Sequence, residues 1–179
     1  MNYKAYYHSP IGWIEIHASF DAVTSIVFCD GPKNDACIDM SESVILAKCV
    51  RQLDEYFTGR RMNFNVSVNQ KGTQFQQTVW NALLDIPFGK TVSYTDVAKT
   101  VNAPRAVRAV GAANGQNKVW IIVPCHRVIG VNGSLTGYAG GLERKKWLLA
   151  HEAQVVSSWK FEVSSWNSNP EPQNLKPET

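Results

Sequence analysis

Hydrophobic and polar residues alternate along the first thirty positions of the chain, as they do in strands that bury one face. The alternation is clearest at residues 12–18 and 24–28, and residues 64–68 give a further candidate strand. From 41 to 57, apolar residues recur at helical spacing, and a glycine that would end a helix follows shortly afterwards. The pattern therefore predicts a small α+β domain, a sheet with one helix, over residues 1–70.

Two capping boxes indicate that a second, helical domain follows. In each box a Thr or Ser precedes, by three residues, a side chain that can return a hydrogen bond to the backbone. The boxes are Thr73–Gln76 and Ser93–Asp96. After the first box, Phe75, Val79 and Leu83 fall on one helical face. We therefore expect one helix to begin at each box.

A third helix is predicted over residues 104–115, because its first residue is a proline and proline is favoured at that position. With the preceding short helix it makes a helix-turn-helix candidate. The residues on its outward face are Arg105, Arg108, Ala109 and Ala112. Two arginines beside two methyl-sized side chains can approach a phosphate backbone closely. The alternative is a surface helix in which alanine serves helix propensity alone.

The remaining pattern defines the end of the second domain. Residues 119–123 form an apolar run of strand length, and residues 142–152 are predicted to be a helix. Beyond that helix the apolar pattern decays, and Ser, Asn, Pro and Glu become frequent. We therefore expect a second domain over residues 73–153 and a polar tail over residues 154–179, of which residues 164–179 are expected to be disordered or loosely attached.

Positive charge is concentrated in the second domain. The whole chain of 179 residues has a formal charge of +3, yet residues 71–152 hold 10 Lys and Arg against 4 Asp and Glu. This block is a candidate surface for a polyanion such as a nucleic acid. Charge alone is equally consistent with an ordinary solvated face.

The sequence predicts neither a membrane span nor a signal peptide. No apolar run reaches 18 residues, and the first eight residues are polar and aromatic. The four cysteines, which show no close pairing rhythm, are Cys29, Cys37, Cys49 and Cys125. We therefore expect reduced thiols in a cytoplasmic protein.

Cys125 and His126 are the candidate reactive pair. The thiolate is a nucleophile, and a neighbouring imidazole or cation lowers the pKa of a thiol. Neighbouring side chains point to opposite faces of extended backbone, so proton transfer between them needs a turn or a bridging water. Glu152 lies on or beside an apolar helix face, where a histidine partner would offset the cost of a buried charge. The alternative for Glu152 is a fraying helix end at which its carboxylate lies in water. A buried structural cysteine is the alternative, and without a second ligand pair at zinc spacing we expect no metal site.

Several motifs in a fixed order resemble those of the O6-alkylguanine-DNA alkyltransferases, also called methylated-DNA–protein-cysteine methyltransferases. They are Gly89–Tyr94, Arg105–Asn114, Asn117, Pro124–Val128, Gly137–Gly141 and Lys146–Glu152. The resemblance is strong over about residues 73–153 and looser before them. It implies an α+β fold, with a small ribonuclease-H-like N-terminal domain and a helical, winged-helix-like DNA-binding domain that carries the reactive cysteine.

The resemblance also implies a role for each residue of the site. Cys125 would accept an alkyl group from O6 of guanine in DNA, with O4 of thymine as a further candidate. His126 would act as a base through a water, and Glu152 would orient it. Tyr94 would donate a hydrogen bond to the flipped base, and Asn117 would hold the active-site turn. The reaction would need no cofactor and no metal, and each molecule would react once.

On the DNA side, the resemblance implies that Arg108 enters the base stack in place of the extruded nucleotide. Arg105, Ala109 and Ala112 would complete a minor-groove contact. The partner would be double-stranded DNA containing O6-alkylguanine, and the chain would act as a monomer. Two other functions remain open: a lesion-binding module that recruits other repair while Cys125 stays silent, and a cysteine hydrolase that uses the same thiol on a small substrate.

Overall fold

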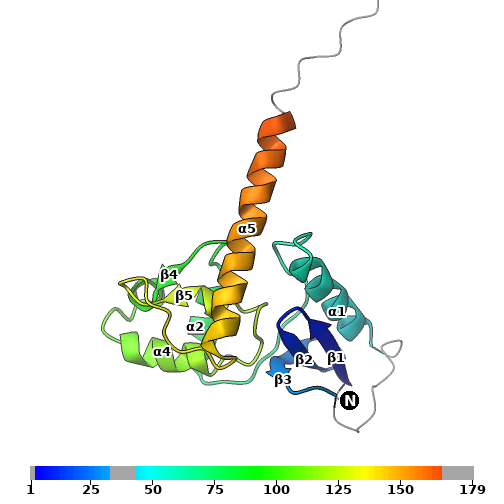
Figure 1. Ribbon diagram of the computed structural model, residues 1–179. Helices are drawn as coiled ribbons and strands as arrows, with labels where there is room; N and C mark the ends of the chain where they lie inside the picture. Colours follow the sequence, from blue (N-terminus) through cyan, green and yellow to red (C-terminus); the bar gives the residue numbers. More distant parts are fainter. Residues whose placement is uncertain (1–2, 33–42, 167–179) are drawn as a thin grey trace, which may run out of the picture.

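The computed structural model describes residues 3–32 and 43–166, which form two domains with a long helix between them (Figure 1). An N-terminal domain contains the three longer strands and helix α1, and a C-terminal domain contains the shorter helices and a two-stranded sheet. The helix between them, α5 (Leu142–Trp166), extends well past both domains. The predicted α+β class with two domains is confirmed.

The N-terminal domain is an antiparallel sheet covered by one helix. Its elements are β1 (Tyr3–Ser9), β2 (Gly12–Ala18), β3 (Val23–Cys29) and α1 (Val44–Phe57), and the strands lie in the order β1-β2-β3. Alternate side chains of β2, such as Ile14 and Ile16, are buried, as the sequence pattern requires. Ser43 caps α1 by accepting a hydrogen bond from the backbone of Leu46, and the helix buries the face that contains Leu53.

The C-terminal domain is built from short elements that bring distant loops together. They are α2 (Gln74–Leu84), β4 (Val92–Ser93), α3 (Tyr94–Thr100), α4 (Val107–Gly115), a 3-10 turn (Cys125–Arg127) and β5 (Val128–Ile129). Strands β4 and β5 pair in parallel. Both predicted capping boxes are present, with Thr73 at α2 and Ser93 at α3.

Helix α4 begins later than predicted. It starts at Val107 rather than at residue 104, because Asn102 adopts a left-handed backbone conformation, with φ of 55°, and a tight turn follows it. Arg105 therefore lies in the connection between α3 and α4 and not on the helix face. Arg108, Ala109 and Ala112 are on α4 and are exposed.

The prediction of a strand over residues 119–123 is wrong. The segment is a compact buried turn in which Ile121 has a φ of 72°, an unusual value for a β-branched residue. Only its first residues pair with a strand: the backbone of Trp120 donates to Ile26, and Ile26 donates to Lys118. The segment is apolar because it is enclosed between the two domains, not because it lies inside a sheet.

Two further expectations are corrected by the structure. Residues 64–68 contribute a single isolated bridge, between Val68 and Val23, in place of a full strand. The helix predicted over residues 142–152 continues to Trp166, so the expected absence of structure is wrong for residues 164–166. Residues 167–179 lie outside the described residues.

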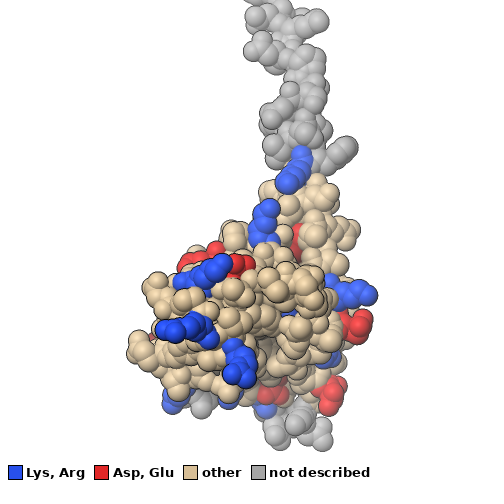
Figure 2. Space-filling model, turned by 90° about the vertical axis from the view of Figure 1, so that its left-hand side faces the viewer, with Lys and Arg blue, Asp and Glu red and all other residues tan. Residues whose placement is uncertain are grey.

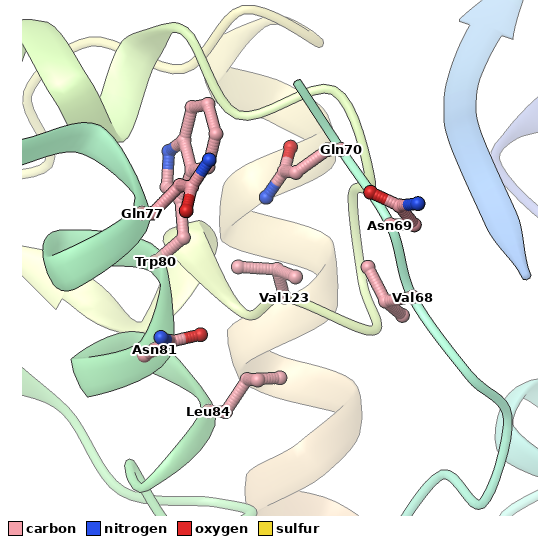
Figure 3. A pocket seen from close by; sticks show the side chains of 8 residues that line it. All are labelled: Val68, Asn69, Gln70, Gln77, Trp80, Asn81, Leu84 and Val123. Carbon is pink, nitrogen blue, oxygen red and sulfur yellow. The ribbon is translucent and has the colours of Figure 1, made fainter. Parts of the chain in front are cut away.

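A small pocket of about 180 Å³ marks the seam between the domains (Figure 3). Gln77 and Trp80 of α2 form one side of it, and Asn69 and Gln70 of the connecting segment form the other. Gln70 accepts a hydrogen bond from the backbone of Lys118, so its carboxamide ties the connecting segment to the C-terminal domain. Gln77 of α2 also donates to the carbonyl of Gly72, so two carboxamides tie the connecting segment to the C-terminal domain.

Candidate active site beneath helix α4

Cys125 lies in a buried turn and is only 2% exposed. The side-chain amide of Asn117 donates to its Sγ at 3.1 Å and to the carbonyl of Val123 at 2.9 Å. The carbonyl of the same amide accepts from the backbone of Val119 at 2.9 Å. Asn117 therefore connects the end of α4, the buried turn and the thiol through one side chain.

The resting thiol is protonated. Burial raises the pKa of Cys125 to about 11, and the hydrogen bond from Asn117 only partly opposes that effect. The positive charge of Lys145 also lowers this pKa, but burial outweighs both effects. Because a thiol is a poor nucleophile, the proton has to leave during the reaction.

His126 and Glu152 form a fully buried pair. Nε2 of His126 is 2.8 Å from Oε1 of Glu152, and both side chains are 0% exposed. Within the described part of the chain, Nδ1 of His126 has no hydrogen-bond partner. Cys125 and His126 lie in a 3-10 turn. Their backbone is therefore not extended, as proton transfer between adjacent side chains requires when no water bridges them.

Arg127 is a member of this site that the sequence analysis did not single out. Its Nε and Nη2 bind the two oxygens of Glu152, each at 2.9 Å, and its Nη1 donates to the carbonyl of Ile86 at 2.6 Å. The guanidinium is almost completely buried. Two parallel hydrogen bonds between opposite charges fix the plane of the carboxylate. The sequence signal that could have pointed to Arg127 is a charged residue that closely follows an apolar run.

Two more donors reach Glu152 from distant parts of the chain. The hydroxyl of Tyr56, on α1, donates to Oε1 at 2.9 Å, and the backbone of Gly89 donates to Oε2 at 2.9 Å. Gly89 has a φ of 71°, and a Cβ there would lie 2.7 Å from Val156. Glycine is required at this close approach, and neither donor was predicted.

The ionisation of Glu152 fixes the tautomer of His126. Burial would raise the pKa of the Glu152 carboxyl, but hydrogen bonds and charge from His126 and Arg127 outweigh burial and lower it to about 2. An ionised carboxylate only accepts hydrogen bonds, so Nε2 of His126 carries the proton. Burial lowers the pKa of His126. Nδ1 is then an unprotonated nitrogen that is available as a base.

The lowered pKa of Glu152 predicts a loss of stability in acid. Between the ordinary carboxyl pKa of 4.5 and about 2, the unfolded chain binds a proton at Glu152 that the folded protein does not. This contribution to the free energy of unfolding is present above pH 4.5 and is lost as the pH falls through about 2. Carboxyl ¹³C chemical shifts of Glu152, followed by NMR, should titrate well below pH 4.5. An ordinary titration curve would contradict the buried ion pair.

Lys145 fastens the loop that covers the site. Its side chain is fully buried, and Nζ donates to the carbonyls of Val128 at 2.6 Å and Thr136 at 2.9 Å. The first carbonyl belongs to β5, and the second lies in the middle of the loop that joins β5 to α5. Lys145 thereby anchors the segment that presents Tyr138 and Ala139.

A groove of about 510 Å³ opens between that loop and α4. Tyr94 and Arg108 line one side, and Tyr138 and Ala139 line the other. The hydroxyl of Tyr138 is buried and has no hydrogen-bond partner among the described residues. Burial raises the pKa of Tyr138. The groove therefore lies between Arg108 on α4 and the loop that carries Tyr138 and Ala139.

The outer surface of α4 combines small side chains with positive charge. Arg108, Ala109 and Ala112 are exposed, whereas Val110 on the opposite side of the helix is fully buried. Figure 2 looks onto the side of the molecule where α4 lies and shows Lys and Arg side chains spread across it. Such a surface favours contact with a polyanion.

The described residues bear on the predictions about membranes, disulfides and metals. None of their helices is long and apolar enough to cross a membrane. Cys29, Cys49 and Cys125 have free thiols, and Cys37 lies outside the described residues. The described His, Cys, Asp and Glu side chains form no group of three that could hold a metal ion.

Two family models together match most of the chain. The model described as 6-O-methylguanine DNA methyltransferase, ribonuclease-like domain matches residues 2–70. The model described as 6-O-methylguanine DNA methyltransferase, DNA binding domain matches residues 74–154. The second match contains every residue predicted for the site.

Similar proteins carry the same description over nearly their whole length. A methylated-DNA–protein-cysteine methyltransferase of Methanosarcina acetivorans is 44% identical over 84% of this chain and 97% of its own length. One from Mycobacterium leprae is 45% identical over 84% and 92%. The crystal structure of Mycobacterium tuberculosis OGT in complex with DNA covers 86% of this chain and 94% of its own, with a TM-score of 0.77 and 41% identity. The chain therefore belongs to the 6-O-methylguanine DNA methyltransferase family.

Proposed function

We propose that this protein repairs DNA by direct reversal, moving a methyl or larger alkyl group from O6 of guanine onto Cys125. The observation that carries the proposal is a buried thiol next in sequence to a histidine that is hydrogen-bonded to a buried carboxylate. A groove lined by Tyr94 and Arg108 is open at the surface of α4. Membership of the family supports the same reaction. In this proposal, residues 73–153 are the domain that binds DNA and accepts the alkyl group.

The proposed reaction is one displacement at the alkyl carbon. Nδ1 of His126 takes the thiol proton through a bridging water, and Glu152 stabilises the imidazolium that forms. The sulfur of Cys125 then bonds to the alkyl carbon while the bond from that carbon to O6 breaks. Tyr94 donates a hydrogen bond to the departing guanine, which finally gains the proton that the thiol lost. No cofactor or metal takes part.

The damaged base has to leave the duplex to reach Cys125. The thiol is too deeply buried to meet a stacked base, so the nucleotide is extruded into the groove. Arg108, exposed on α4 at the rim of the groove, fills the gap that it leaves. Ala109 and Ala112 allow α4 to sit in the minor groove, and Arg105 contacts the backbone from the preceding turn. One chain supplies every one of these residues, which supports action as a monomer.

The product distinguishes this proposal from its competitors. A thioether is not a leaving group under mild conditions, so each chain should convert one O6-methylguanine to guanine and then stop. Titrating the protein against a duplex with one lesion, and counting repaired bases by chromatography, should give an end point of one per chain. Tight binding that leaves the lesion intact would instead identify a lesion-binding module. Release of a small product over many cycles would identify a hydrolase.

Arg108→Ala should slow transfer from duplex DNA by about tenfold or more, because holding a base out of the stack costs a few kcal/mol. Transfer from free O6-methylguanine base should change much less, since no duplex has to be opened. Single-turnover rates at saturating DNA measure both. Arg60→Ala is the matched control, because Arg60 is an exposed arginine of the other domain, where it pairs with Asp54. Equal slowing on duplex and free base would contradict the role of Arg108.

A further inference from the structure

Tyr56 is the one described side chain of the N-terminal domain that hydrogen-bonds to the histidine–carboxylate pair. It lies near the end of α1, and its side chain is 0% exposed. Its hydroxyl donates to Oε1 of Glu152 at 2.9 Å. The same oxygen accepts from Nε2 of His126 at 2.8 Å. A residue separated from Glu152 by almost one hundred positions therefore shares the oxygen that holds the proposed base.

The position of Tyr56 is fixed on several sides. Its backbone carbonyl accepts from Nε2 of His151, on α5, at 2.8 Å. Its ring packs edge-on against Phe57 and Phe88 and lies tilted against Phe64. A buried hydroxyl needs a partner, and this packing aims it at Glu152. The end of α1 is thus joined to α5 through both the backbone and the side chain of one residue.

We propose that Tyr56 is a positioning residue for alkyl transfer, through which the N-terminal domain sets the orientation of Glu152 and the basicity of His126. The inference rests on the proposed function, because it concerns the rate of that reaction. It assigns the N-terminal domain a part in the chemistry in addition to its packing. Tyr56 itself would touch neither the DNA nor the transferred group.

The direction of the effect follows from the competition for Oε1. Glu152, Arg127 and Lys145 shift the pKa of His126, and Cys125 precedes His126 in the 3-10 turn. Only the carboxylate among them favours the imidazolium at neutral pH. A phenol that donates to Oε1 withdraws part of its negative charge from His126. Without the hydroxyl, the pKa of His126 should rise. His126 should then be unprotonated, and able to act as a base, over a narrower range of pH.

Tyr56→Phe tests the proposal because it removes only the hydroxyl. The rate of single-turnover transfer in the full-length protein falls in acid as His126 becomes protonated. We expect the midpoint of that fall to move upward by about half a pH unit in Tyr56→Phe. The matched control is Tyr7→Phe, which removes a phenol hydroxyl 3.4 Å from Asp54 on the same helix, away from the site. That variant should keep the wild-type midpoint.

The outcomes separate this inference from the proposed function. If the wild-type protein transfers no alkyl group, the proposed function fails and the inference fails with it. If the wild type reacts and Tyr56→Phe keeps its midpoint, Tyr56 is only a packing residue and the inference alone is overturned. The imidazole titration of His126, followed by NMR, should show the same upward shift. A Tyr56→Phe protein that does not fold would also overturn the inference, because loss of one hydroxyl should leave the chain folded.

Discussion

Replacing Cys125 with alanine is expected to abolish alkyl transfer and to leave DNA binding nearly unchanged. The variant loses the only atom that the proposed reaction alkylates, whereas the exposed surface of α4 stays intact. A duplex with one O6-methylguanine should keep its lesion after incubation with the variant, as chromatography of the digested DNA would show. Its dissociation constant, measured by fluorescence anisotropy, should stay within a few-fold of wild type.

Cys29→Ser is the matched control for this prediction. Cys29 also has a free thiol, at the end of β3 in the other domain, and it is partly accessible. Its replacement should leave both the rate of transfer and the affinity for DNA unchanged. Residual transfer by Cys125→Ala, or loss of transfer in Cys29→Ser alone, would place the acceptor at another residue.

Arg127→Met is expected to lower the free energy of unfolding by about 3–5 kcal/mol, because it leaves the Glu152 carboxylate buried without its cation. Urea unfolding at neutral pH, followed by tryptophan fluorescence, measures the change. Arg60→Met provides the control, since Arg60 and Asp54 form a similar ion pair in solvent. Breaking that exposed pair should cost about 1 kcal/mol or less.

A second substitution separates the loss of the charge partner from a general loss of packing. In Arg127→Met combined with Glu152→Gln, no charge remains buried at the pair. The double variant should therefore be less destabilised than the sum of the two single variants. Additive losses, or an Arg127→Met protein as stable as Arg60→Met, would mean that water reaches the carboxylate and screens it.

The elements that could be predicted from the sequence are those set by neighbouring residues. The alternation at Gly12–Ala18 matches β2 because a strand with one buried face repeats every two residues. The capping boxes at Thr73 and Ser93 locate the starts of α2 and α3 because their hydrogen bonds span three residues. The apolar face that contains Leu148 placed Glu152 on or beside buried residues, but it left open whether the carboxylate lies in water; the structure buries it.

The elements that were wrong depend on contacts between distant residues. Residues 119–123 have the composition of a strand, yet the amide of Asn117 bonds both ends of the turn and Ile121 reverses the chain. The apolar composition of a segment indicates that it is buried, but it does not indicate which other residues pack against it. The extension of α5 past residue 152 was missed because polar composition alone does not end a helix.

The candidate site shows the same division. Cys125, His126 and Glu152 were singled out from the sequence, and the structure places His126 directly against Glu152. Tyr56 and Arg127 were not singled out, because their importance lies in a hydrogen bond that no local pattern contains. The sequence does show that Arg127 is a cation beside an apolar run and that Tyr56 is an aromatic residue near a helix end. Neither feature indicates which residue it will bind.

The most direct test of the central claim is the mass of the protein after it meets its substrate. Wild-type protein mixed with an excess of O6-methylguanine duplex, digested and analysed by mass spectrometry, should show the added mass of one methylene on the peptide that contains Cys125. The modification should persist in reducing agent, and a second portion of duplex should add nothing. Repaired DNA beside an unmodified Cys125, or the added mass on another residue, would contradict the account.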